Sequence, residues 1–490
     1  MRAPLDYADP AAGELQVALS RAAAEQPQQR LGALFFNPGG PGVDGLPMAA
    51  FFAGRWSEPD TGYPASAQLK QMSERYDLIG FSPRGLGAGT RLDCGAPVVP
   101  GIDSYSYYDS SPENLKALQD AVRLQAQACG ANALSKHIHT DAMARDMDLM
   151  RTLLGDEKLD YIGYSYGTRL GAWYASLFPE RVGRMLLDSS AYLTGSADEI
   201  SLLQAFGKTR LLDEIFLPYA TRHPLTFNLG ESIAGLQSAL MALWPQLKDL
   251  LFSHENNVAL AEAIDWSHSQ SIDSSLVHKN AALGLQSLLA QQPAADEGQI
   301  RAAITAHRFA PDTQINQRAV VYAQQMATEL FKAPDHSAKK FPVETAVRWS
   351  VSCNDSHTGF DAQHLSIAAQ ADDSFAGQVC AYWPKPGIQR PLLAMTQSAG
   401  PILMLQSRFD AMTPIEGAQA TLDALPNASM IVVENEFTHG VFPYGEECVD
   451  GQVARYFLQG TMPQRLSSCA GRPLRFDVAG SSNAGQRPPR

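Results

Sequence analysis

The chain has 490 residues, more than one compact core usually holds, so we expect two or three structural units. About 45% of the residues are hydrophobic and 18% are charged, which is typical of a folded globular protein. The formal net charge of -13 argues against nucleic acid as a partner, because proteins that bind nucleic acid concentrate Lys and Arg.

The sequence contains no apolar run of 18 residues, so we expect no transmembrane helix. The first twenty residues, MRAPLDYADPAAGELQVALS, lack a long apolar core and are not a signal peptide. The protein is therefore expected either to stay inside the cell or to have a signal peptide that is absent from this sequence.

Six cysteines occur along the chain in three local groups of two, and no two of them have the C-x-x-C spacing of a metal site. This even distribution favours disulfides and an oxidising compartment. Six buried, reduced thiols in an intracellular protein are the alternative. The cysteines are Cys94, Cys129, Cys353, Cys380, Cys448 and Cys469.

The first two hundred residues alternate short apolar runs with helical patterns. Strands are predicted at 31–36, 76–81, 159–165 and 184–190, and helices at 139–154 and 167–178. Buried strands that alternate with helices indicate a parallel sheet. From about 195 to 385 amphipathic helices dominate, and strands return at 401–410 and 429–437.

The segment Gly163-Tyr164-Ser165-Tyr166-Gly167 has the pattern G-x-S-x-G between a predicted strand and a predicted helix. That context is the one in which a sharp turn exposes a nucleophilic serine near a helix N-terminus. Glycines are needed on either side because larger side chains would collide in such a turn. A tight turn with an uninvolved serine is the alternative interpretation.

A nucleophilic serine needs a histidine base and an acid that orients it, in the chain order Ser, acid, His. Asp410 follows the predicted strand at 401–406, and His439 follows the strand at 429–437. Both therefore lie where parallel strands end and where sites in such sheets collect. A structural histidine and a turn-capping aspartate are the alternatives.

The segment NPGGPG at 37–42 follows the first clear strand, and its glycines allow close approach of the backbone to a neighbour. We expect the amides of Gly40 and Tyr166 to form an oxyanion hole. The alternative is an ordinary Gly/Pro loop.

The chain resembles a known family at several motifs. The segments PLDYADP, NPGGPG, SPRGLGAGT, ARDMDLMRTLLG, YIGYSYGTRLGAWYASLFPERVGRMLLD, RFDAMTPIEGA and THG look like those of secreted tripeptidyl aminopeptidases and related proline iminopeptidase-like α/β-hydrolases. The resemblance runs from residue 3 to about 470 and is weakest in the helical insertion. It implies a triad of Ser165, Asp410 and His439, export from the cell, and the disulfides Cys94–Cys129, Cys353–Cys380 and Cys448–Cys469.

We therefore expect an α/β-hydrolase fold with a largely helical cap inserted between the nucleophile and acid strands. The expected units are the N-terminal part of the core at 1–194, the cap at 195–390, the C-terminal part of the core at 391–475, and a flexible tail at 476–490.

Neither a cofactor nor a metal is expected. GLGAG at 85–89 lacks the third glycine of a dinucleotide-binding loop, and His137 and His139 have no further metal ligands nearby in the sequence. A substrate with a free N-terminus requires a carboxylate that holds its ammonium group. Asp355 and Glu344 are candidates, with solvated surface acids as the alternative for both.

The expected function is that of a serine hydrolase that releases short peptides or single residues from the N-termini of peptides. A carboxylesterase or lipase with the same triad is the main alternative, and a hydrolase-fold binding protein without turnover is a third hypothesis. The expected partner is a peptide with a free N-terminus, and the expected location is secreted or periplasmic.

Overall fold

The computed structural model describes residues 1–58, 63–96, 105–251, 268–332, 339–355, 379–384, 388–389 and 391–478. The chain divides into two compact units. The core unit comprises Met1–Val99, Asp120–Gly207 and Ser337–Gly471, and the helical unit comprises Pro100–Gln119, Lys208–His336 and Arg472–Arg490. The sequence predicted a helical segment at 195–390. In the structure, the part of this segment from Ser337 onward belongs to the core unit instead.

The core unit is built on an eight-stranded sheet with the order β12-β11-β10-β8-β7-β4-β5-β3. All neighbouring strands run parallel except β3 and β5. The mostly parallel sheet confirms the predicted fold class. The strands are β3 (Leu19–Ala22), β4 (Gly32–Asn37), β5 (Tyr76–Phe81), β7 (Leu159–Tyr164), β8 (Val182–Asp188), β10 (Ile402–Ser407), β11 (Ala428–Glu434) and β12 (Leu466–Ala470).

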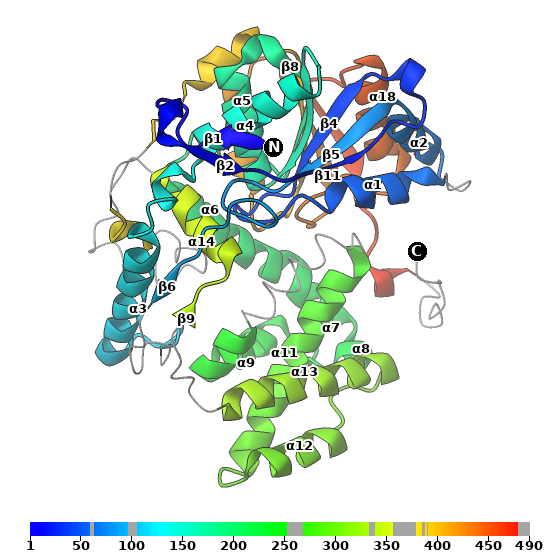
Figure 1. Cartoon of the computed structure of the whole chain (residues 1–490). Helices are drawn as coiled ribbons and strands as arrows, with labels where there is room; N and C mark the ends of the chain where they lie inside the picture. Colours follow the sequence, from blue (N-terminus) through cyan, green and yellow to red (C-terminus); the bar gives the residue numbers. More distant parts are fainter. Residues whose placement is uncertain are drawn as a thin grey trace. The chain divides into compact units, whose positions relative to one another are not determined.

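Helices cover both faces of this sheet (Figure 1). The helices α1 (Met48–Ser57), α2 (Ala65–Arg75) and α18 (Gln452–Gln459) lie on one face, and α4 (Thr140–Leu153) and α5 (Tyr166–Leu177) lie on the other. Every residue of β4, β5, β7 and β10 is buried as a result, which explains why these strands are nearly continuous apolar runs.

The order of the strands brings the predicted site together. Ser165 follows β7, Asp410 follows β10 and His439 follows β11, and the strands β7, β8, β10 and β11 are consecutive neighbours. Parallel strands end at the same edge of a sheet, so the three loops converge there although they are up to 274 residues apart in the sequence (439 − 165).

The helical unit contains α7 (Leu217–Arg222), α8 (Pro224–Phe227), α9 (Ile233–Met241), α11 (His268–Gln291), α12 (Glu297–Ala306) and α13 (Thr313–Phe331). Local capping explains two of the helix starts. Asp296 forms a capping box with Gln299 at α12, and the side chain of Asp312 accepts a hydrogen bond from the Ile315 amide at α13. Among its described residues this unit contains no strand, in agreement with the amphipathic patterns in the sequence.

The beginning of the expected flexible tail packs within the helical unit. Asp477 accepts hydrogen bonds from the guanidinium of Arg222, at 2.8 and 2.5 Å, and lies 2.7 Å from the imidazole of His223. Phe476 makes an edge-to-face contact with Phe227 at 5.6 Å between ring centroids. The chain is therefore anchored up to Asp477, and residues 479–490 lie outside the described part.

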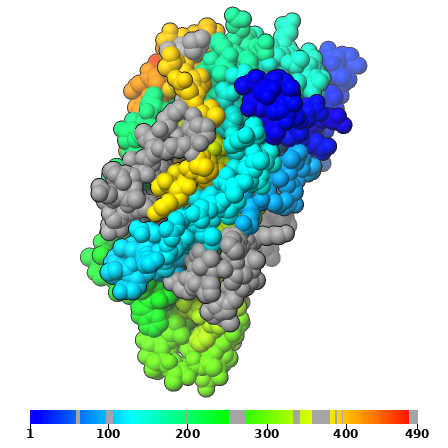
Figure 2. Space-filling view, turned by 60° about the vertical axis from the view of Figure 1, so that its left-hand side comes forward, coloured from blue at the N-terminus to red at the C-terminus, as the bar shows by residue number. Residues whose placement is uncertain are grey.

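The N-terminal segment is tied to the core by a buried ion pair. The fully buried Arg84 contacts both carboxylate oxygens of Asp146, at 2.8 and 2.6 Å, and donates to the Leu5 carbonyl at 3.2 Å. Tyr7 donates to the same Asp146 at 2.8 Å. Figure 2 shows this N-terminal segment, in dark blue, on the surface of the core unit.

The six cysteines form three disulfides, each between two cysteines that lie near one another in the sequence: Cys94–Cys129, Cys353–Cys380 and Cys448–Cys469. This is the pairing that the family resemblance implies. No helix in the described ranges is both long enough and apolar enough to cross a membrane.

Candidate active site

Ser165 sits in a strained turn between β7 and α5. Its backbone has φ 56° and ψ −122°, a region that residues other than glycine rarely adopt. A Cβ at Gly163 would lie 2.5 Å from the Gly167 carbonyl oxygen, and one at Gly167 would lie 2.8 Å from the Asn37 carbonyl oxygen. Both flanking positions therefore have no room for a side chain, which is the reason predicted for the two glycines.

Asp410 lies in the loop after β10 and is completely buried. Its Oδ1 accepts hydrogen bonds from the amides of Met412 and Thr413, each at 2.9 Å. Its Oδ2 accepts the Thr413 hydroxyl, also at 2.9 Å. Three donors compensate the cost of burying this carboxylate and fix its orientation.

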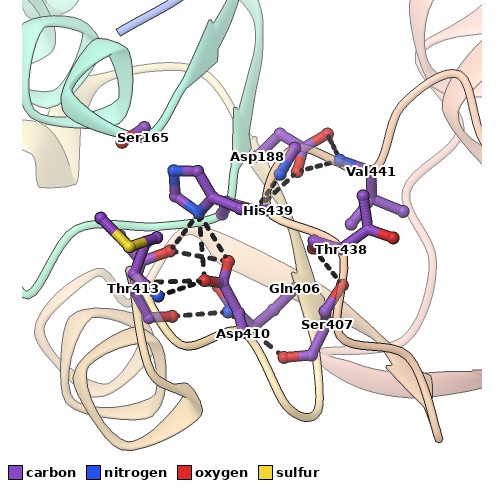
Figure 3. A network of polar contacts seen from close by, with 12 residues as sticks. Ser165, Asp188, Gln406, Ser407, Asp410, Thr413, Thr438, His439 and Val441 are labelled. Atoms are coloured by element: carbon purple, nitrogen blue, oxygen red, sulfur yellow. Dashed lines mark hydrogen bonds and ion pairs between the residues drawn. The ribbon is translucent and has the colours of Figure 1, made fainter. Parts of the chain in front are cut away.

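His439 lies between the other two predicted triad residues. Its Nδ1 is 3.0 and 2.9 Å from the two oxygens of Asp410. Figure 3 shows the imidazole with Nδ1 facing Asp410 and its other nitrogen on the side of Ser165. The His439 side chain is 25% exposed and that of Asp410 is 0% exposed, so the acid is shielded and the base is open to a substrate. The His439–Asp410 pair thus has the arrangement that a serine–histidine–acid triad requires of its base and acid.

Thr413 is a member of this cluster that the sequence reasoning missed. Its hydroxyl lies 2.9 Å from Oδ2 of Asp410 and 3.3 Å from Nδ1 of His439. The available signal was the spacing Asp-x-x-Thr directly after a strand, because a carboxylate at such a position commonly accepts hydrogen bonds from residues two and three places on.

The glycine loop after β4 runs along the serine turn. A Cβ at Gly39 would lie 2.9 Å from the Ser165 Cβ and 3.2 Å from the Tyr166 amide nitrogen, so only glycine allows this approach. The Gly39 amide itself donates to the side chain of Asn37 at 3.0 Å. The next amide along the loop belongs to Gly40, which keeps the pair Gly40 and Tyr166 as the predicted oxyanion donors.

Asp355 does not have either role considered from the sequence. It is 3% exposed, and its two oxygens accept hydrogen bonds from the amide and the hydroxyl of Thr140, at 3.1 and 2.5 Å. Asp355 is therefore neither a solvated surface acid nor a carboxylate open to a substrate ammonium. The sequence alone could not indicate this role, because the hydrogen-bond partner of Asp355, Thr140, is 215 residues away.

Glu344 is the other acid considered from the sequence, and it is exposed in the first turn of α14 (Val343–Asn354). Its backbone touches the glycine loop, since a Cβ at Gly42 would lie 2.3 Å from the Glu344 carbonyl oxygen. Gly39, three residues before Gly42, contacts Ser165. Three residues span at most about 10 Å, so Glu344 and the serine turn are held close together by one short loop.

Of the histidines His137 and His139, the second has a structural explanation. The side chain of His139 caps α4 by accepting the Ala142 amide at Nδ1, at 3.2 Å. Burial lowers the pKa of His139 to about 4, which keeps Nδ1 available as an acceptor. Within the described ranges no group of three His, Cys, Asp or Glu side chains could hold a metal ion.

Comparison with known proteins agrees with this fold. A family model described as alpha/beta hydrolase fold matches residues 32–242, and one described as TAP-like protein matches residues 367–469. The chain therefore has an α/β-hydrolase fold with a TAP-like region at 367–469, and the resemblance to tripeptidyl aminopeptidases is confirmed.

Curated relatives cover most of the chain. It is 27% identical to a tripeptidyl aminopeptidase of Streptomyces lividans over 480 residues, which are 95% of this chain and 82% of that protein. It is 26% identical over 502 residues to serine protease Hip1 of Mycobacterium tuberculosis, covering 95% and 86%. It is 29% identical over 477 residues to carboxylesterase B of the same species, covering 95% and 85%. The relatives thus include both peptidases and an esterase.

Proposed function

We propose that this serine hydrolase is an exopeptidase that removes short peptides or single residues from the N-termini of peptides. The observation that carries the proposal is the position of His439 between the buried Asp410 and the strained turn of Ser165 (Figure 3). The relatives named tripeptidyl aminopeptidase and serine protease support a peptide substrate.

In the proposed mechanism Ser165 attacks the scissile carbonyl while His439 takes the proton from its hydroxyl. Asp410 fixes the imidazole through Nδ1 and stabilises the cation that forms. The amides of Gly40 and Tyr166 donate hydrogen bonds to the oxyanion, supported by the N-terminus of α5. His439 then protonates the leaving amine, and water, activated by the same imidazole, releases the acyl group from Ser165.

Recognition of a free N-terminus is assigned to Glu344 in this proposal. An extended peptide of two or three residues spans roughly 7–10 Å, which matches the span of the loop that joins Ser165 to the Glu344 backbone. A carboxylate at that distance would hold the substrate ammonium while the scissile carbonyl reaches the serine. Asp355 is excluded from this role because both of its oxygens are bonded to Thr140.

A carboxylesterase is the second candidate, because the same triad hydrolyses esters and a relative at 29% identity is named carboxylesterase B. We further propose that the protein works outside the cytoplasm. Three disulfides support this location, since they persist in oxidising compartments.

One set of assays tests these proposals. Wild-type protein should be labelled by a fluorophosphonate, and Ser165→Ala should lose both labelling and turnover; labelling that survives would exclude Ser165 as the nucleophile. Anilides of peptides of one to four residues, free or N-acetylated, then test exopeptidase activity. We expect turnover of the free forms only, whereas turnover of acyl esters alone would establish the esterase.

A further inference from the structure

Asp188 and Ser189 lie at the end of β8, between the strand of the predicted nucleophile and the strand of the predicted acid. Both residues are completely buried. Their peptide groups bond to both neighbours: the Ser165 amide donates to the Asp188 carbonyl at 3.0 Å, and the Ser189 amide donates to the Leu405 carbonyl at 2.9 Å. The pair is therefore fixed to the serine turn on one side and to β10 on the other.

The side chains of the same pair hold the loop that follows His439. The Asp188 carboxylate accepts the amide of Val441, at 2.9 and 3.0 Å, and that of Phe442 at 2.6 Å. The Ser189 hydroxyl accepts the Gly440 amide at 2.7 Å. Three successive backbone amides after His439 thus donate hydrogen bonds to the side chains of two adjacent residues. Ser189 has φ 55°, a strained conformation for serine, as it makes this contact.

A third connection reaches the loop of Asp410. The amide of Ser190 donates to the side-chain oxygen of Gln406 at 2.9 Å, and the amide group of Gln406 donates to the Thr413 carbonyl at 2.8 Å. The turn of Ser165 and the loop of His439 are therefore bonded directly to the segment 188–190, and the loop of Asp410 is bonded to it through Gln406. The contacts between this segment and the loops join residues 23 to 254 positions apart in the sequence.

Asp188 also brings an ionisable group into electrostatic contact with His439. Figure 3 shows Asp188 beside His439 on the side of Val441, whereas Asp410 faces Nδ1. Burial raises the pKa of Asp188 to about 7, while the Phe442 and Val441 amides and the imidazolium favour its ionised form. The other titratable groups near it are Asp410 on the acid loop and Tyr164 on β7, and Glu436 lies on the histidine loop.

We propose that Asp188 is a positioning residue for the hydrolytic reaction. It holds the loop of His439 in register with the turn of Ser165, and the ionised form of its carboxyl group adds a second negative charge that stabilises the imidazolium formed when the serine attacks. This inference rests on the proposed function, because it assigns His439 the role of base. Asp410 remains the direct partner of Nδ1.

The variant Asp188→Asn tests both parts with little change of shape. One amide oxygen at the Oδ2 position can still accept the Phe442 and Val441 amides, whereas the NH2 group at the Oδ1 position can no longer accept from Val441, so the substitution removes the charge and one of the two acceptor contacts to Val441. We expect kcat to fall about 10- to 100-fold with KM nearly unchanged. The acid limb of kcat/KM should move to lower pH by about one unit, because the neutral side chain no longer favours the imidazolium.

Asp160→Asn is the matched control. Asp160 is a buried carboxylate on the adjacent strand β7 that also accepts a backbone amide, from Arg184, but it lies near the opposite end of that strand from Ser165. It should change neither kcat nor the acid limb. If Asp188→Asn behaves like Asp160→Asn in both measurements, the proposal is wrong.

Two further measurements distinguish failure of this proposal from failure of the proposed function and from misfolding of the variant. The titration of the His439 ring, followed by NMR and assigned with His439→Gln, needs no substrate and should show a lower pKa in Asp188→Asn. Loss of fluorophosphonate labelling in wild type would refute the proposed function without affecting this titration. If Asp188→Asn does not fold, Ser189→Ala removes the Gly440 contact together with the longer hydrogen bond that the Ser189 hydroxyl donates to Oδ1 of Asp188 at 3.3 Å, and it should lower kcat about 5-fold; an unchanged kcat in that variant would overturn the proposal.

Discussion

The carboxylate of Asp355 receives both the amide and the hydroxyl hydrogen of Thr140, and the Thr140 hydroxyl oxygen lies 2.5 Å from the hydroxyl of Tyr166. Because Thr140 donates to Asp355, Tyr166 is the donor to Thr140. Burial, together with the nearby Asp355, raises the pKa of Tyr166, so its hydroxyl stays protonated and can donate. Asp355 is thereby linked to the residue whose amide is the predicted oxyanion donor.

Asp355→Ala should therefore lower both stability and turnover. The change leaves the Thr140 amide at the start of α4 without its acceptor, which costs about 1–3 kcal/mol of unfolding free energy. It also removes the acceptor that orients the Thr140 hydroxyl to which Tyr166 donates, so kcat should fall several-fold. Urea unfolding and steady-state kinetics check the two effects.

The same variant separates this role from recognition of the substrate ammonium. A positioning role predicts that KM changes equally for free peptide anilides and for acyl esters, which carry no ammonium group. A rise of KM confined to free peptides would show instead that Asp355 binds the N-terminus. Asp355→Asn, which keeps one acceptor, should show a smaller loss of stability than Asp355→Ala.

Thr413→Val should impair the reaction without affecting binding. The substitution removes the hydroxyl that donates to Asp410 and leaves a side chain of nearly the same size, so Asp410 loses one of its donors. We expect a drop in kcat of about 10-fold and an unchanged KM. Thr413→Ser retains the hydroxyl and should keep most of the activity, and equal losses in the two variants would contradict a role for the hydrogen bond.

The parts of the site that were predictable from the sequence depend on local patterns. The glycines around Ser165, and the position of Asp410 directly after an apolar strand, follow from turn sterics and from the geometry of parallel sheets. Asp188 and Asp355 were not predictable in the same way. Their partners are 253 and 215 residues away, and no local pattern indicates which buried donor a carboxylate will meet.

Glu344→Gln tests the proposed clamp for the substrate N-terminus. Loss of the charge should raise KM for free peptide anilides by about 10-fold, since an ion pair with the ammonium is replaced by a neutral contact. Acyl esters should be unaffected. Glu180→Gln is the control, because Glu180 is an exposed acid that precedes β8, at the sheet edge away from Ser165. Equal kinetics in the two variants would exclude Glu344 as the clamp.

The stability of the protein should depend on pH through Asp160. Burial raises its pKa to about 6 from the usual 3.8, so the folded state holds a proton that the unfolded state has lost between these values. The stabilisation from Asp160 is then complete below about pH 4 and is lost as the pH rises through about 6, by an amount on the order of 3 kcal/mol. Asp160→Asn cannot titrate, so its free energy of unfolding relative to wild type should increase over this interval. Urea unfolding of both proteins at pH 4, 5, 6 and 7 measures the difference, and a constant difference would show that Asp160 titrates alike in the folded and unfolded states.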